Sequence, residues 1–195
     1  MPMQVCPGYR PNGHEAPFRY VSSAGFTLLE LLVTVAVLAI LITLAVPSFT
    51  SLINSNRLAA QANEVIASLQ VARTEAIRLN RRTIICRSTD GATCAGAGQW
   101  TQWITFVDTD SNGAPAAAEI VRVNTAKAPL QVTSANPSIT FRADGMARNA
   151  AGALLDNAIV VCIPTTRPAE NRRTVNLATG SRISSASSNG AGACP

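Results

Sequence analysis

The sequence predicts an α+β protein in which a long N-terminal helix precedes an antiparallel β-sheet. Three observations lead to this fold class: an apolar run at 26–46, an amphipathic pattern of helical spacing after it, and short β-type runs separated by turn signals in the remainder. With 195 residues, the chain has the size of one domain with appendages. We divide it into four segments, residues 1–25, 26–46, 47–82 and 83–195.

The apolar run at 26–46 is long enough to cross a membrane. Its 21 residues span the roughly 30 Å hydrocarbon core at the rise of an α-helix. The preceding segment carries more basic than acidic residues, so the positive-inside rule predicts a cytoplasmic N-terminus and an exported C-terminal part. The alternative is a secretory signal peptide cleaved after Ala45. Such signals have apolar cores of about 7–15 residues, and Glu30 in the first turn would serve no signal peptidase.

An amphipathic helix is predicted for residues 47–82. Apolar side chains recur there at spacings of three and four, which places them on one helix face. They are Leu58, Ala62, Val65, Ile66, Leu69, Ala72, Ala76 and Leu79. Polar residues, Gln61 among them, fall on the other faces, and Pro47 would bend or loosen the helix where it leaves the membrane. We therefore expect one long helix whose second half packs on a globular head.

From Thr83 onward the pattern is typical of strands and turns. The β-type runs are RTIICRS, QWTQWITFV, EIVRV, SITFR, AIVVCI and RTVNLA. Asp-Gly, Asn-Gly and Thr-Gly pairs separate them, as in an antiparallel arrangement. Helix first and strands afterwards predict an α+β head. The stretch SSASSNGAGA near the end has low complexity, and we expect a flexible tail there.

The stretch GFTLLELLVTVAVLAILITLAVPSF resembles the N-terminal signature of type IV prepilins and type II secretion pseudopilins. This resemblance implies a pilin-like fold, cleavage by a prepilin peptidase between Gly25 and Phe26, and N-methylation of Phe26. The leader, residues 1–25, is longer than the leaders usual in this class. The fifth mature residue is then Glu30. We hypothesise that its carboxylate pairs with the α-ammonium group of Phe26 on a neighbouring subunit, which neutralises two charges that apolar surroundings penalise.

The head narrows this resemblance to the GspH/FimT family of minor pilins and pseudopilins. The similar residues are ASLQVARTEAIRLNRRTIIC, two tryptophans before TFVDTDSNG, and a late cysteine pair. The resemblance implies a FimU/FimT-like structural subunit that primes or joins assembly of a type IV pilus; a GspH-like subunit of a type II secretion pseudopilus is the alternative. It implies a single pass through the inner membrane, a periplasmic head, and other minor and major pilins or pseudopilins as partners.

Four of the five cysteines lie after the apolar run, an even number that suits an oxidising compartment. Four cysteines allow three pairings. We favour Cys86 with Cys94, because the two bracket a turn, and Cys162 with Cys194, which would tether the tail. Free buried thiols are the alternative.

No catalytic set is evident in the sequence. The only histidine, His14, lies in the leader, which argues against a zinc site and against nucleophilic triads. We therefore predict that the chain is not an enzyme and uses no cofactor. One stretch, DTDSNGAPAAAE, does match the calcium-loop pattern, with Asp108, Asp110, Asn112 and Glu119 as candidate ligands. We favour a polar turn, because the stretch lies between two β-type runs rather than between two helices.

The chain has a net charge of +5, and 15 of its 16 basic residues are arginine. Some members of the resembled family look like DNA-uptake receptors with a Gly-Arg-x-Arg motif near the C-terminus. The matching place here reads Gly-Ser-Arg-Ile, so Arg182 alone keeps its position. Arg172 and Arg173 lie nearby in the sequence. For these three arginines we favour a solvated basic face, with DNA binding as the alternative.

Overall fold

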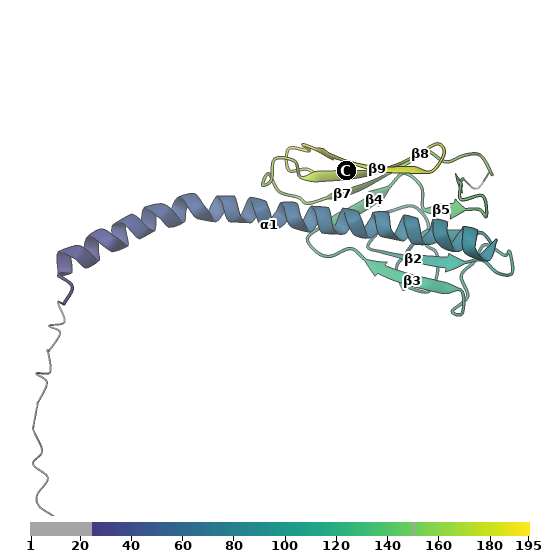
Figure 1. Ribbon diagram of the computed structural model, residues 1–195, viewed down its shortest axis with the longest axis horizontal. Coiled ribbons are helices and arrows are strands. Elements are labelled where there is room, and N and C mark those ends of the chain that lie inside the picture. The colour runs from purple at the N-terminus through teal and green to yellow at the C-terminus, as the bar shows by residue number, and fades with distance from the viewer. Residues whose placement is uncertain (1–24, 150) are drawn as a thin grey trace, which may run out of the picture. The chain divides into compact units, whose positions relative to one another are not determined.

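The computed structural model describes residues 25–149 and 151–195. It contains two compact units, Met1–Leu41 and Ile42–Pro195. One helix, α1 (Leu28–Leu79), begins in the first unit and ends in the second (Figure 1). Apart from Gly25, the predicted leader lies outside the described residues.

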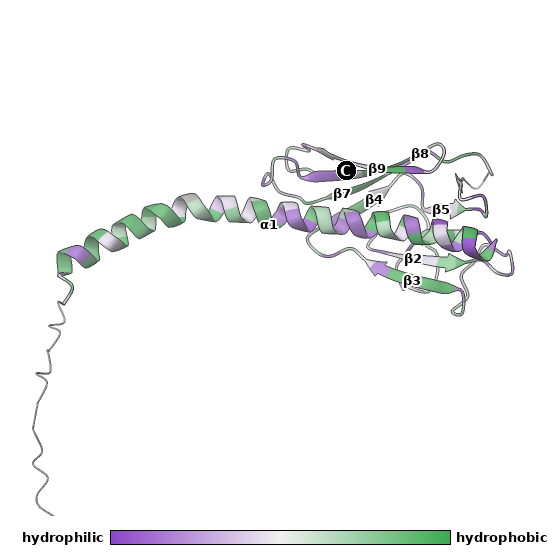
Figure 2. Ribbon diagram, viewed as in Figure 1, coloured by the Kyte–Doolittle hydropathy of each residue, from purple (hydrophilic) through white to green (hydrophobic). Residues whose placement is uncertain are grey.

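In the first unit, α1 begins directly after Thr27. The backbone N–H of Glu30 donates to Thr27 Oγ1 at 3.2 Å, and Leu31 N donates to the Thr27 carbonyl at 3.1 Å. Thr-x-x-Glu is the spacing of a capping box, which explains why the helix starts here. The side chains from Gly25 to Leu41 are exposed, and Figure 2 shows that most of them are apolar. Among the described residues, α1 is the one helix long and apolar enough to cross a membrane.

In the second unit, α1 continues through Pro47, so the prediction of one long helix is confirmed. Most of the predicted apolar face is buried. Leu79 departs from the prediction, since its position at the helix end leaves it 39% exposed. The placement of Gln61 away from the buried face was wrong. This side chain is 2% exposed, because its Oε1 accepts the backbone N–H of Lys127 at 3.0 Å and so satisfies a donor inside the head.

The strands form two antiparallel sheets. The five-stranded sheet has the order β3-β2-β1-β5-β6, and the four-stranded sheet has the order β4-β7-β8-β9. Their bounds are β1 (Thr83–Ser88), β2 (Gln102–Val107), β3 (Ile120–Thr125), β4 (Gln131–Ser134), β5 (Ser138–Phe141), β6 (Ala147–Arg148), β7 (Asn157–Cys162), β8 (Arg172–Ala178) and β9 (Arg182–Ser188). The predicted α+β class is confirmed, with the strands divided between two sheets rather than joined in one.

Six strands match the predicted β-type runs, whereas β4, β6 and β9 were not predicted. The expectation of a flexible tail was wrong for β9, which includes the SSASS half of that stretch and pairs with β8 along its whole length. Its side chains are mostly exposed. An edge strand of this kind is held by backbone hydrogen bonds, so it carries little of the apolar alternation that marks a strand in a sequence.

The core of the second unit lies where α1 meets both sheets, with β2 and β3 on one side of the helix and β7 to β9 on the other in Figure 1. Helix residues such as Leu69 pack with Ile85 and Phe141 of the five-stranded sheet and with Val175 of the four-stranded sheet. Successive side chains of a strand point to opposite faces, so the outer face of the five-stranded sheet carries a second, smaller apolar cluster. That cluster consists of Ile84, Cys86, Ile104 and Phe106.

Candidate functional site

The predicted processing and assembly residues lie at the start of α1. Gly25 and Phe26 precede the capping residue Thr27, so the bond between them lies outside the helix, and Phe26 is 82% exposed. The Glu30 carboxylate has no hydrogen-bond or ion-pair partner within the described part of the chain. Its backbone N–H caps the helix, while its charge remains available for a group outside this chain.

A polar seam between α1 and the five-stranded sheet was missed by the sequence analysis. Trp103 Nε1 donates to Ser68 Oγ at 3.1 Å, and Ser68 Oγ lies 3.2 Å from Asn124 Oδ1. Asn124 Nδ2 donates in turn to Glu64 Oε1 at 2.8 Å, and Gln61 Nε2 donates to Glu64 Oε2 at 3.0 Å. The seam holds the helix against the head through hydrogen bonds among buried and half-buried side chains. Gln61, Glu64 and Ser68 recur at helical spacing, which is the signal that would have indicated it.

The structure joins Cys86 to Cys94 and Cys162 to Cys194, the pairing that we favoured. Their Cα atoms lie 5.5 and 5.6 Å apart, within the normal range for disulfides. Inside the first loop, Asp90 accepts hydrogen bonds from the Thr93 hydroxyl and from two backbone N–H groups. These bonds, that from the Thr93 side chain first, hold the pKa of the Asp90 carboxyl well below its ordinary value.

The C-terminal end is held by more than its disulfide. The Ala193 carbonyl accepts from Arg172 Nε at 3.1 Å and from Arg172 Nη2 at 2.9 Å. The buried Asn171 donates to the same carbonyl and accepts the backbone N–H of Gly190 at 2.7 Å. The predicted tether of the tail by Cys194 is confirmed, and these side chains add partners for backbone groups that the sequence pattern leaves unassigned.

The three candidate DNA-binding arginines do not share one surface. Arg172 is occupied by the Ala193 carbonyl, and Arg173, the next residue, points to the opposite face of β8. Arg182 is exposed and pairs with Ala178, at the far end of β8 from Arg172. Just before it, Ser181 takes a positive φ of 60° and is anchored by Arg73 Nη1 on its carbonyl. A solvated basic face remains our prediction for these three arginines, with DNA binding as the untested alternative.

The acidic loop connects β2 to β3. Asp108, Asp110 and Glu119 offer carboxylate oxygens that lie within 4.8 Å of one another. Buried Asp108 forms an ion pair with Arg82, and Asn112 Nδ2 donates to Asp110 at 2.6 Å.

Glu119 closes the base of this loop. It accepts hydrogen bonds from the Thr109 hydroxyl, from Thr109 N at 2.7 Å and from Ala116 N at 3.1 Å. The same bonds, led by that from the Thr109 side chain, lower the pKa of the Glu119 carboxyl. The carboxylates of the acidic loop thus already have partners within the chain. The polar turn remains our prediction for this loop, with calcium binding as the untested alternative.

Comparison with solved structures finds similarity to a type IV minor pilin and to a minor pseudopilin. One is the type IV minor pilin FimU of Pseudomonas aeruginosa (strain PAO1), in its crystal structure in space group P21. It is 21% identical to this chain, with a TM-score of 0.50, and the match covers 67% of this chain and 88% of FimU. The other is the minor pseudopilin EpsH from the Type 2 Secretion System of Vibrio cholerae. It is 12% identical to this chain, with a TM-score of 0.49, and the match covers 67% of this chain and 97% of EpsH. The comparison with curated proteins finds no match.

Two family models match the sequence itself. The prokaryotic N-terminal methylation motif matches residues 21–46, which include the predicted cleavage site and Glu30. The model described as Type II transport protein GspH matches residues 61–181, more than half of the chain and most of the head. The chain therefore belongs to the GspH family of minor pilins and pseudopilins.

Proposed function

We propose that this chain is a minor subunit that primes or joins the assembly of a type IV pilus. One observation supports this most directly: an exposed apolar helical segment, with an unpaired acid in its first turn, precedes a disulfide-bonded head. Apolar surface of this extent must be shielded from water. Lipid shields it first, and neighbouring helices shield it afterwards. The similar fold of FimU, a type IV minor pilin, supports the same role.

In this proposal the inner membrane holds residues 26–46 and the head lies in the periplasm. Prepilin peptidase cuts between Gly25 and Phe26 and methylates the new terminus. The helix then moves from lipid into the filament without exposing its apolar side chains to water. In the filament the Glu30 carboxylate meets the α-ammonium group of a neighbouring Phe26, and this pairing sets the stagger of the helices. The role requires helix packing and a head that selects neighbours, with no catalytic step by this chain.

Two alternatives follow from particular observations. A type II secretion pseudopilus is favoured by the description of the matched family, Type II transport protein GspH. A DNA-binding minor pilin for natural transformation is favoured by the exposed Arg182 near the C-terminus. Pilus assembly remains our preference. The second disulfide and the hydrogen bonds of Arg172 fix the C-terminal end on the head, which gives other subunits an ordered surface to contact.

Deletion of the chain followed by three assays separates these roles. We expect loss of surface pili and of twitching, normal type II secretion, and restoration by the intact gene. Impaired secretion with normal piliation would favour the pseudopilus instead. Normal piliation with loss of DNA uptake would favour the DNA receptor. Normal piliation, normal type II secretion and normal DNA uptake in the deletion strain would contradict all three roles.

A further inference from the structure

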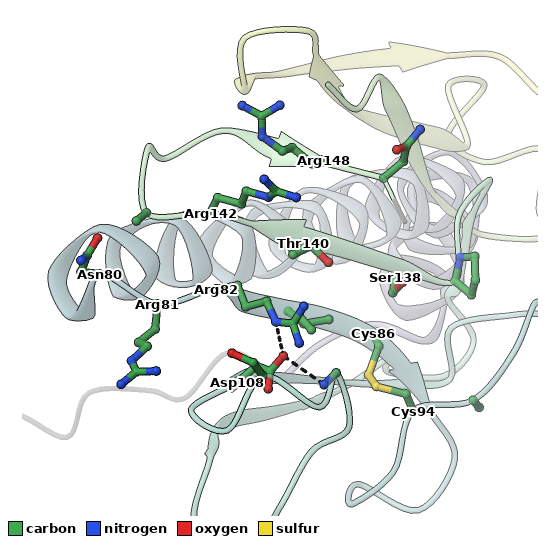
Figure 3. A pocket seen from close by; sticks show the side chains of 17 residues that line it. Asn80, Arg81, Arg82, Cys86, Cys94, Asp108, Ser138, Thr140, Arg142 and Arg148 are labelled. Carbon is green, nitrogen blue, oxygen red and sulfur yellow. Dashed lines mark hydrogen bonds and ion pairs between the residues drawn. A yellow bond between two sulfur atoms is a disulfide. The ribbon is translucent and has the colours of Figure 1, made fainter. Parts of the chain in front are cut away.

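The outer face of the five-stranded sheet, turned away from α1, holds a pocket of about 680 Å³ (Figure 3). The alternation of side chains explains which residues reach it. Ile85 and Phe141 point into the core beneath α1, whereas their neighbours Ile84 and Thr140 line the pocket. The Cys86–Cys94 disulfide forms part of its wall.

The same alternation and the strand register bring three arginines to this face. Arg82 lies two residues before Ile84, and Arg142 lies two residues after Thr140. Arg148 in β6 lies directly opposite Thr140 in β5. Figure 3 shows Arg142 and Arg148 on one side of Thr140 and Arg82 on the other. Arg142 and Arg148 come from one hairpin, formed by β5 and β6, whereas Arg82 precedes β1 and is distant from them in the sequence.

Positive charge exceeds negative charge in the lining. Four arginines contribute, with Arg81 as the fourth, against one carboxylate, that of Asp108. Asp108 is already paired with Arg82. Arg148 has an ion-pair partner, Asp144, at 2.9 Å, but this residue does not line the pocket. A concave site with one sign of excess charge concentrates the field and attracts ions of the opposite sign.

Two of the guanidinium groups keep unused donors. Arg142 is exposed, and its side chain has no hydrogen-bond or ion-pair partner among the residues that the structure describes. The Nε of Arg148 is buried without a hydrogen-bond partner. Both groups lie beside Gly152: its carbonyl accepts from Arg148 Nη1 at 3.1 Å, and a Cβ built there would lie 3.4 Å from Arg142 Nη2. Both guanidinium groups thus approach Gly152. The Asp144 carboxylate, which pairs with Arg148 and whose pKa is lowered by both arginines, offsets only one of their two positive charges.

We propose that this pocket binds a phosphate-type oxyanion, with Arg142 and Arg148 as its main ligands. The planar fork of a guanidinium group suits the paired oxygens of such an anion. An anion between the two arginines would relieve their mutual repulsion, and the hydroxyl groups of Thr140 and Ser138 in the lining supply further donors. The arginines gather in one depression rather than along a track, so the pocket takes a single phosphate group of a small molecule. This site is independent of the proposed filament role.

The test is an anion titration of the full chain in neutral detergent micelles. Sodium phosphate should raise the melting temperature in a saturable manner, whereas sodium chloride of equal ionic strength should not. Arg142→Ala should weaken the apparent phosphate affinity at least about tenfold, and it removes no hydrogen bond on which the fold depends. Arg122→Ala, at an exposed position of β3 outside the pocket, is the matched control and should titrate like the wild type.

Equal effects of phosphate and chloride, or an unchanged titration of Arg142→Ala, would overturn the proposal. A stronger response to citrate than to phosphate would exclude phosphate as the preferred class. Further arms test the source of the phosphate group: a single-stranded oligonucleotide and vesicles of anionic phospholipid. Displacement of phosphate by either probe, dependent on Arg142 but not on Arg122, would support phosphate recognition at this pocket but overturn its assignment to a small molecule. If Arg142→Ala still bound phosphate and both probes, the anion site would lie elsewhere and the proposal would be wrong.

Discussion

Glu30 combines two functions that one substitution separates. As the third residue after Thr27, it stands at the inner position of a capping box, and its side chain also carries the acid proposed to pair between subunits. Glutamine suits the same capping position but has no charge. Helix initiation should therefore survive Glu30→Gln, while any interaction that requires a carboxylate is lost.

We predict that Glu30→Gln lowers the amount of this subunit in sheared filaments while its level in the membrane stays unchanged. The reason is that an unpaired α-ammonium group of Phe26 would remain in apolar surroundings. Immunoblots of the two fractions measure both quantities. Glu75→Gln removes an acid from the helix surface of the head and should behave as the wild type. Normal filament content of Glu30→Gln would refute the ion-pair hypothesis.

Asp90 links the stability of the first disulfide loop to pH. The Thr93 hydroxyl, the N–H groups of Thr93 and Ala92, and the Ser88 hydroxyl all donate to this carboxylate and lower its pKa in the folded state. An aspartate in an unfolded chain has a pKa of about 3.9. The unfolded chain therefore binds the proton at higher pH than the folded chain does. The stabilisation is fully present above that pH and is lost as the pH falls toward the lower folded value.

We predict that Asp90→Asn loses stability at neutral pH and that its stability then falls less steeply than that of the wild type as the pH drops below about 4. Chemical denaturation at a series of pH values measures the two slopes. Asp156→Asn removes an exposed carboxylate outside this loop and should follow the wild-type curve. Parallel curves for wild type and Asp90→Asn would show that these hydrogen bonds do not favour the charged form.

Among elements, the two disulfides differ in how much of the chain they enclose. Cys86 and Cys94 are 8 residues apart, whereas Cys162 and Cys194 are 32 apart. In the chain-entropy description, the longer loop restricts the unfolded chain more. The longer bridge also keeps the Ala193 carbonyl over Arg172 and Asn171, so its removal should release the end of the chain.

We predict that Cys194→Ser lowers the free energy of unfolding by about 3 to 4 kcal/mol, and Cys94→Ser by about 2 to 3 kcal/mol. Urea denaturation under non-reducing conditions gives both values. Limited proteolysis should trim the C-terminal residues of Cys194→Ser and leave those of Cys94→Ser intact. A larger loss for Cys94→Ser would mean that packing around the buried Cys86, rather than loop entropy, decides the order.

The acidic loop between β2 and β3 is predicted to be stable without calcium. Its carboxylates already accept hydrogen bonds from Thr109, Asn112 and Gly113 or pair with Arg82, whose positive charge opposes a cation at Asp108. Addition of calcium, followed by a chelator, should leave the melting temperature unchanged. A saturable rise that Asp110→Ala abolishes would contradict this expectation and make the loop a metal site.

For the whole molecule, the family match and the exposed apolar segment lead to one prediction about the mature chain. We expect its first residue to be Phe26 carrying one methyl group on the α-nitrogen, since the Gly25–Phe26 bond lies ahead of the helix and the methylation motif surrounds it. Mass spectrometry of the purified protein from its own host measures this. Host cells without prepilin peptidase are the control, and a mature chain that begins after Ala45 would instead indicate a secretory signal.

Local patterns in the sequence were sufficient for the helix and for the N-terminal methylation motif. Spacings of three and four recur wherever one helix face is buried, and a turn between Cys86 and Cys94 limits their possible partners. The capping residue Thr27 and Glu30 can likewise be read directly, because a cap depends on neighbours within one turn. Such features depend on residues close in sequence, so the sequence alone determined them.

The tertiary structure decided which distant residues meet. The pairing of serine-rich β9 with β8 depends on backbone hydrogen bonds, which leave little trace in side-chain pattern. Arg82, Arg142 and Arg148 gather in one pocket only because β5 lies between β1 and β6 in the five-stranded sheet. Strand order of this kind follows from long-range packing around α1. The sequence by itself thus determined the helix, the N-terminal methylation motif and the class of the protein, while packing decided the neighbours of each head residue.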